Sequence, residues 1–434
     1  MKLKKNDYLI GGILLVYCLI GIIPNFNTLD RVANQWLMMS IANTIGLAYL
    51  FNNFDTYKST LKKIFQFKPF IFFLIFVLWG LLSYFYALNQ IEVVVKFFTW
   101  INIVIGILVF CLLLFASNKS LLLVSYIFSI ILIIELYFSY STFFELSRLA
   151  VFNFEYVNLL KGAAGNKNIL AISILLKIPF LFYLVSKNKN IFIKIIFSGL
   201  ITSASFLIFL LSARASILGI LMILFVTFIF ILIRYIKNRD RYLLGNSFIY
   251  LVIPILLSIT IFQLKFGSSN NSVSIGQRAT SINTQDDSTN QRLRFYKHSA
   301  NQIFSNPILG VGLGNWKISS IDYDKKDIEG YQVPYHVHND FLEIGAELGI
   351  LGFILYLSVF MYMFYYVLKI LIYEGSTSKE LAPISLVLLL GGIVYFIDAN
   401  LNFPHARVIN QIPFILYIAI FFQLYHKKLK NEKS

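Results

Sequence analysis

Apolar runs long enough to cross a lipid bilayer recur along most of this chain. We count about twelve, each near the 17 to 25 residues that an α-helix needs to cross the hydrocarbon core. A lone strand in lipid would leave its backbone N–H and C=O groups without partners, so the runs are expected to be helices. The sequence therefore predicts an all-α polytopic membrane protein with spans at 8–24, 32–51, 68–88, 91–116, 119–140, 168–186, 190–211, 215–236, 244–263, 346–370, 381–399 and 409–426. The runs on either side of Arg214 nearly fuse, which leaves the count open by one.

The composition supports this class, since 58% of the 434 residues are hydrophobic and 13% are charged. Lysine and arginine gather in every second connection, and the intervening outward connections near 25–31 and 89–90 hold almost none. The positive-inside rule then places the N-terminus in the cytoplasm. The net charge of +16 follows from this topology and requires no nucleic-acid partner. Cys18 and Cys111 fall inside spans, where they are expected to act as small apolar residues.

Three segments face outward in this topology, at 141–167, 265–345 and 400–408. The expected organisation is a unit of about nine spans (1–263), a large outer loop (264–345) and about three further spans with a basic tail (346–434). Within the loop, QRLRFYKHSANQIF has helical periodicity and predicts an amphipathic helix lying on the membrane surface. Its expected apolar face is Leu293, Tyr296, Ala300, Ile303 and Phe304.

Two arginines are unusual for their positions. Arg214, in LLSARASILG, lies between two apolar runs, and Arg292 lies in the outer loop, where topology requires no positive charge. One interpretation is an arginine that extends from the interface to water. The other is a guanidinium that binds an anion, because arginine binds phosphate bidentately and stays charged at any working pH.

The stretch HVHNDFLEIGAELGILG (336–352) begins the tenth span with ionisable groups. Asn339 or Asp340 can cap the helix, which places His338 beside its positive N-terminal end and favours a neutral ring. A neutral imidazole can take a proton from a hydroxyl group. A surface histidine in a polar loop is the plainer interpretation. A zinc site is a third, with His336 and His338 joined by His298 or His405.

Four motifs, taken together in order, resemble the O-antigen ligase and polymerase superfamily of bacterial membrane glycosyltransferases. They are GAAGNKNILA (162–171), LLSARASILG with Arg214, RLRFYKHSANQIFSNPILGVGLGNW with Arg292, and HNDFLEIGAELG with His338, Asn339 and Gly349. The chain departs from the family pattern at Ala213, where serine is expected, and at Lys167, where proline is expected. Lys167 adds an outward cation, which points to a different acceptor or an acidic glycan.

The resemblance implies a class C-like glycosyltransferase architecture and a reaction. A glycan carried on undecaprenyl pyrophosphate would move to an acceptor hydroxyl at the outer face of the bacterial inner membrane. The acceptor could be a lipid A core, a second glycan chain or a protein, and neither a metal nor another cofactor is expected.

The residues allow roles in this reaction. His338 would act as general base, and Arg214 and Arg292 would stabilise the departing pyrophosphate. Five further residues are candidates for substrate binding, namely Lys167, Arg294, Asn339, Glu343 and Asp398. The helical period places Arg294 about 200° around the helix from Arg292, so the two arginines are not expected to face one phosphate.

Functions of other classes stay open at this point. A flippase for lipid-linked glycans would share the spans, but it would be expected to show paired halves and charges near mid-bilayer. No repeat between the halves is visible, and the ionisable groups gather at one face, with Lys96 and Lys177 as exceptions that lie inside spans. A non-catalytic assembly partner would not need Arg214 or His338.

Overall fold

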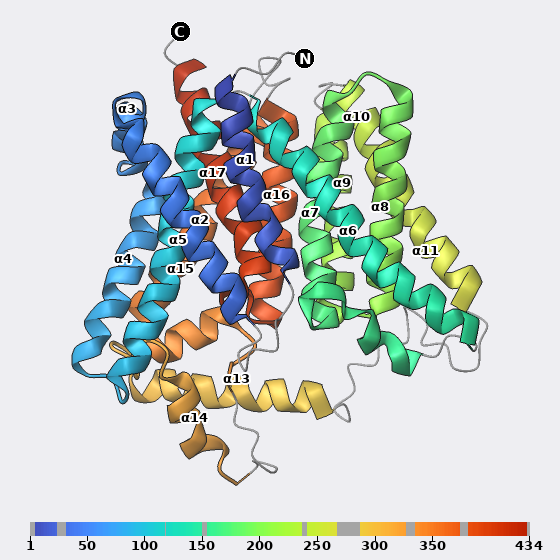
Figure 1. Cartoon of the computed structure of the whole chain (residues 1–434). Helices are drawn as coiled ribbons and strands as arrows, with labels where there is room; N and C mark the ends of the chain where they lie inside the picture. Colours follow the sequence, from blue (N-terminus) through green and yellow to red (C-terminus); the bar gives the residue numbers. More distant parts are fainter. Residues whose placement is uncertain are drawn as a thin grey trace.

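The computed structural model of the chain describes residues 5–23, 32–117, 119–149, 154–236, 241–266, 287–326, 335–373 and 381–431 (Figure 1). In these ranges the regular structure is helical and contains no strand. The predicted all-α class is therefore confirmed.

Each predicted apolar run falls on one helix or on two or three consecutive helices. Ten such segments in the described ranges are long and apolar enough to span a membrane. They are α4 (Lys68–Leu82, continued by η2, Ser83–Phe85), α5 (Gln90–Ala116), α6 (Ser120–Leu149), α7 (Lys167–Lys187), α8 (Ile191–Leu211), α9 (Arg214–Ile236), α10 with η4 and α11 (Arg241–Ser247, Phe248–Val252 and Ile253–Phe266), α15 (Asp340–Tyr373), α16 (Leu381–Leu401) and α17 (Val408–Asn431).

The remaining two predicted spans are α1 (Lys5–Leu19, followed by η1, Ile20–Ile22) and α2 (Ala33–Asn52). The first is a short apolar helix, and the second carries polar side chains that face protein. Asn43 on α2 accepts a hydrogen bond from Tyr17 at 2.7 Å and donates to Asn102 on α5 at 2.9 Å. These bonds satisfy the buried amide, as an apolar environment requires.

The two runs around Arg214 are separate helices. Ser212 has a φ of 53°, a left-handed conformation that ends α8 before α9 begins at Arg214. Arg214 is therefore the first residue of a helix and lies at the end of its span.

Three helices form the centre of the bundle. Within the apolar windows, 89% of α7, 83% of α16 and 94% of α17 is buried by protein, against no more than 61% in the other seven segments. One ion pair lies beside this centre: the Lys177 ammonium is 2.9 Å from the Glu135 carboxylate and 2.6 Å from the Ser173 hydroxyl.

The start of α1 and the end of α17 lie at one end of the bundle, together with α3 (Phe54–Ile64) (Figure 1). Helix α13 (Asp287–Ser305) runs across the opposite end, near α14 (Trp316–Asp324). Because both ends of the described chain lie at the same end of the bundle, the number of spans is expected to be even. If the termini are cytoplasmic, as the basic residues predict, α13 lies outside.

Two boundaries differ from the prediction. Helix α6 continues to Leu149 and η3 covers Phe154–Ala164, so much of the outward segment 141–167 is helical. Helix α15 begins at Asp340 rather than near 346, and Gly349, with a φ of 67°, interrupts it. Residues 340–348 therefore form a short helix before the long one.

The amphipathic helix is confirmed as α13, but its predicted apolar face is right only in part. Tyr296 and Ile303 pack against buried side chains, as expected, whereas other positions differ. Leu293 and Phe304 are 54% and 83% exposed, whereas Phe295, Ser299 and Gln302 are buried. The reason is that α13 packs on the short helix of α15, where Ser299 donates a hydrogen bond to the Leu342 carbonyl at 2.8 Å.

Candidate functional site

A glycine-rich turn holds the short helix 340–348 in place. Gly310, Gly312 and Gly314 all have positive φ angles, which residues with a Cβ rarely adopt. The Gly312 amide donates to the Glu347 carbonyl at 2.8 Å, and a Cβ on Gly310 would lie 2.4 Å from the backbone of Glu347. The turn thus pairs its backbone directly with the short helix.

His338 stands just before this helix in a conformation that its neighbours impose. Its φ of 63° is left-handed, which is uncommon for a residue other than glycine. The Tyr296 hydroxyl on α13 donates to the His338 carbonyl at 3.0 Å. Asn339 caps the helix by accepting a hydrogen bond from the Leu342 amide at 3.0 Å, as predicted. Such strain at a fixed position is typical of functional sites.

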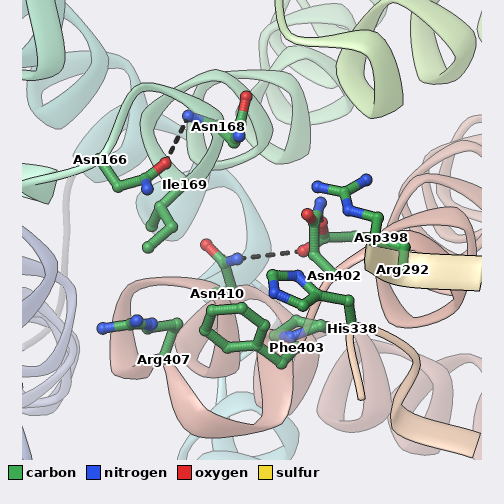
Figure 2. Close-up of a pocket in the computed structure, with 11 residues that line it drawn as sticks. Asn166, Asn168, Ile169, Arg292, His338, Asp398, Asn402, Phe403, Arg407 and Asn410 are labelled. Carbon is green, nitrogen blue, oxygen red and sulfur yellow. Dashed lines mark hydrogen bonds between the residues drawn. The ribbon is translucent and has the colours of Figure 1, made fainter. Parts of the chain in front are cut away.

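The imidazole of His338 points into a small polar cavity of about 60 Å³ (Figure 2). The cavity joins segments that are far apart in the sequence. It is lined by Asn166, Asn168, Ile169, Arg292, His338, Asp398, Asn402, Phe403, Pro404, Arg407 and Asn410.

The cavity environment keeps His338 uncharged. Burial, followed by the nearby guanidinium of Arg292, lowers the pKa of His338 to about 4. Its Nδ1 atom is buried and has no hydrogen-bond partner among the described residues. The Phe403 ring packs edge-on against the imidazole, with centroids 4.9 Å apart. A neutral ring with an unused nitrogen is suited to accept a proton.

Of the two predicted catalytic arginines, the structure places Arg292 in the cavity and Arg214 beside the same helix. The Arg214 Nη1 atom donates to the Thr289 hydroxyl on α13 at 3.0 Å. Thr289 and Arg292 are three residues apart and so share one face of α13. Arg214 itself does not line the cavity.

Asp398 lines the cavity from the end of α16, as the sequence suggested. Its two carboxylate oxygens accept hydrogen bonds from the amides of Asn402 at 2.6 Å and Asn410 at 3.1 Å. Figure 2 shows the bond from Asn410 beside the histidine. The carboxylate is thereby held in one orientation.

Two predicted substrate-binding residues are engaged elsewhere. Arg294 forms an ion pair with Asp324 on α14, with Nε and Oδ1 2.7 Å apart, and does not line the cavity. Glu343 is buried and bonds to His336 rather than to His338, with 3.0 Å between its Oε1 atom and the histidine Nδ1. Both side chains are therefore directed away from the position where His338 would react.

The other two predicted substrate-binding residues lie at the edge of the site. Lys167 begins α7 between Asn166 and Asn168, both of which line the cavity, although Lys167 does not. Asn339 acts as the helix cap and is also absent from the lining. Asn168 lies in the GAAGNKNILA motif, which assigned it no role. The only sequence signal of Asn410 is its place at the start of an apolar run.

A second cluster of ionisable side chains is buried behind the cavity wall. Asp340 lies 2.6 Å from Nδ1 of His405, and Glu343 lies 3.4 Å from Nε2 of the same ring. Burial acts to lower the pKa of His405, but the two carboxylates outweigh it and raise the pKa to about 9. Burial lowers the pKa of His336 to about 4, against the opposing effect of Glu343.

The cluster has the composition of a metal site, since nitrogen and oxygen atoms of His336, Glu343 and His405 lie within 4.8 Å of one another. His338 is not part of it, contrary to the zinc site considered from sequence. Each of the three side chains is already hydrogen-bonded within the cluster, and none leaves a buried polar atom unsatisfied. The arrangement therefore fits an ion network.

One family model matches the middle of the chain. Residues 197–357 match the family model described as O-Antigen ligase. The resemblance inferred from the motifs is thereby confirmed over the segment that contains Arg214, Arg292 and His338. The first part of the chain and the last two spans lie outside the matched segment.

Two curated proteins are similar to a shorter part of the chain. A Rickettsia conorii protein, whose name gives polysaccharide ligase as a provisional description, is 42% identical over 72 residues. A Rickettsia typhi protein with the same provisional description is 40% identical over 72 residues. Each alignment covers 16% of this chain and spans 18% of the relative's length.

Proposed function

We propose that the protein is an inverting membrane glycosyltransferase of the O-antigen ligase type. It would move a glycan from undecaprenyl pyrophosphate to an acceptor hydroxyl at the outer face of the bacterial inner membrane. The observation that carries the proposal is the neutral His338, whose imidazole lines the same cavity as the Arg292 guanidinium. The match to the O-antigen ligase model supports the choice of reaction.

In the proposed step, His338 takes the proton from the acceptor hydroxyl as its oxygen attacks the anomeric carbon. A new carbon–oxygen bond forms, and the bond from that carbon to the pyrophosphate oxygen breaks. The undecaprenyl pyrophosphate leaves with the electron pair of the broken bond on its terminal phosphate oxygen, which carries the developing negative charge. Arg292, with Arg214 beside the same helix, would stabilise that charge electrostatically.

The surrounding residues would orient the sugar. Asp398 is held by Asn402 and Asn410, and carboxylate and carboxamide groups are suited to hydrogen-bond sugar hydroxyls. Phe403 supplies an apolar face beside His338. No step of this mechanism requires a metal ion or a nucleotide.

The acceptor separates three versions of the proposal. A lipid A core would make the protein a ligase, the end of a growing glycan would make it a polymerase, and a protein hydroxyl would make it an O-oligosaccharyltransferase. We favour the ligase version because the matched family model carries that description.

A transporter for lipid-linked glycans is the alternative from another class. Its strongest support is the Lys177–Glu135 pair, which lies within the spans α7 and α6. Both side chains are only 4% exposed and are bonded to each other and to Ser173. A buried pair whose groups bond to each other in this way is more typical of a contact between packed helices than of a transport pathway.

The test is the profile of surface and lipid-linked glycans in a strain that lacks the gene, complemented with wild type, His338→Ala or His298→Ala. Accumulation of glycan polymer on undecaprenyl pyrophosphate in the deletion strain supports the ligase, provided that wild type and His298→Ala restore its transfer and His338→Ala does not. Single repeats on the final carrier without a ladder would indicate a polymerase. Full correction by His338→Ala would overturn the mechanism.

A further inference from the structure

The buried cluster around His405 joins the two segments that enclose His338. One segment is the first turn of α15, which follows His338 directly, and the other is 402–407, which carries Phe403 and Arg407 into the cavity wall. The proposed reaction uses no member of the cluster. Its place behind the wall raises the question of what it does for the site.

The ring of His405 bridges two carboxylates of the same helix. Nδ1 lies 2.6 Å from Asp340, and Nε2 lies 3.4 Å from Glu343, one turn further along α15. The backbone amide of His405 also donates to Asp340 at 3.3 Å. Side chain and main chain are thus attached to α15 at three points.

Aromatic stacking fixes the same region from both sides. The Trp100 ring on α5 stacks on His405, with centroids 5.6 Å apart and planes at 10°. Phe403 stacks on His336 at 4.4 Å and 13°, while its edge meets His338. His336 in turn bonds to Glu343 at 3.0 Å. A displacement of His405 would therefore move Phe403 relative to His338.

We propose that His405 is a positioning residue, which holds segment 402–407 against α15 and thereby keeps His338 and Phe403 in their places in the cavity. The effect on catalysis rests on the proposed function, but the attachment of the segment does not. Since small displacements of reacting groups can slow a reaction about 100-fold, the contribution is measurable.

Charge makes His405 suited to this role. It faces Asp340 and Glu343 on α15, His336 just before that helix, and the uncharged Trp100 on α5. Lys96 on α5 acts electrostatically on His336. A protonated ring can donate to both carboxylates at once, whereas a neutral ring can donate to only one.

The first experiment reads the attachment without any activity assay. Nitrogen NMR of the protein in bilayers can resolve its five histidines by substitution. We expect a doubly protonated ring at neutral pH that loses a proton near pH 9, disappears in His405→Gln and persists in His298→Gln. Hydrogen exchange in 400–412 and 336–345 should accelerate together in His405→Gln. A neutral His405, or unchanged exchange, would overturn the proposal.

The second experiment separates positioning from mere folding. His405→Gln should lower kcat about 10- to 100-fold with little change in KM, and should remove the loss of wild-type activity above pH 9. His298→Gln should keep both wild-type properties. An unchanged kcat would contradict the positioning role, whereas absence of transfer by wild type would contradict the proposed function and leave the exchange result to decide the attachment.

The third experiment measures the metal content of the purified protein. A stoichiometric metal ion in the purified protein that is lost in His336→Asn and His405→Gln would show that an ion, rather than a protonated His405, joins these side chains. That result would overturn the proposal. Metal content that is negligible in the wild type would support it.

Discussion

The hydroxyl of Tyr296 donates a hydrogen bond to the carbonyl of His338, 42 residues away, at 3.0 Å. The same hydroxyl lies 3.1 Å from the Asn400 carbonyl, so its single proton is shared between the two carbonyl oxygens. One side chain on α13 therefore joins the helix to two segments that border the cavity. Loss of this contact should therefore disturb the cavity around His338 more than the packing of the membrane-spanning helices.

Tyr296→Phe tests this contact. It removes the hydroxyl alone, and we expect a loss of about 1 kcal/mol in local stability and a several-fold lower kcat, because a typical hydrogen bond contributes about that much. Thermal unfolding and transfer rates measure the two effects. Tyr323→Phe is the matched control on α14, and equal effects of the two variants would contradict the linking role of Tyr296.

The two loop arginines should behave differently. Arg292→Ala removes the guanidinium from the cavity and should lower kcat about 100- to 1,000-fold, the usual range for a group that stabilises a developing anion. Arg294→Ala breaks the pair with Asp324 and should loosen α14 while most activity is kept. Transfer assays together with proteolysis of the loop distinguish these effects. Similar losses of kcat in both variants would contradict the assignment.

Activity should persist at unusually low pH. The folded pKa of His338 is about 4, below its ordinary value of 6.5, so the base stays neutral until the pH approaches 4. Because the unfolded chain binds the extra proton first, this residue lowers the stability of the fold between about pH 6.5 and 4. The pH dependence of kcat/KM measures the effect, and an acidic limb centred near 6.5 would contradict the buried environment.

The apolar helices, the amphipathic helix and the asparagine cap follow from local sequence. Helical periodicity operates over a few residues, and in the described ranges ten of the twelve predicted spans fall on segments long and apolar enough to cross a membrane. The rotation of α13 could not be predicted in this way. Ser299 faces inward because it meets Leu342 on α15, a residue 43 positions further along the chain.

The partners of the charged residues also depend on distant segments. The helical period separates Arg292 from Arg294, but it cannot show that Asp324 holds Arg294. Asp340 and His405 are 65 residues apart, and nothing in either segment marks them as a pair. The motif identifies the candidate base, whereas the network behind it depends on contacts between segments that are distant in the sequence.

The glycine turn should be intolerant of side chains. Gly310→Ala places a Cβ 2.4 Å from the Glu347 backbone at a φ of 68°, and we expect a loss of roughly 1–3 kcal/mol in stability. Gly199→Ala is the control, since its Cβ would meet nothing within 4 Å. Thermal unfolding in detergent compares them, and an unaffected Gly310→Ala variant would show that the turn does not pack as described.

The buried pair between α6 and α7 should be structural. Glu135→Leu leaves the Lys177 ammonium without its carboxylate and should cost about 3–5 kcal/mol. The double variant Glu135→Leu with Lys177→Met should recover most of that loss and retain glycan transfer. A stable double variant without activity would instead support a role for the pair in moving substrate.

The central claim is that His338 is the base of a glycan transfer. Its most direct test is single-turnover transfer by purified protein from an undecaprenyl-pyrophosphate-linked glycan, with His338→Ala compared to wild type and His298→Ala. We predict that His338→Ala still binds the lipid donor but transfers about 100- to 10,000-fold more slowly, the range for loss of a general base. Transfer by His338→Ala at the wild-type rate would contradict the account.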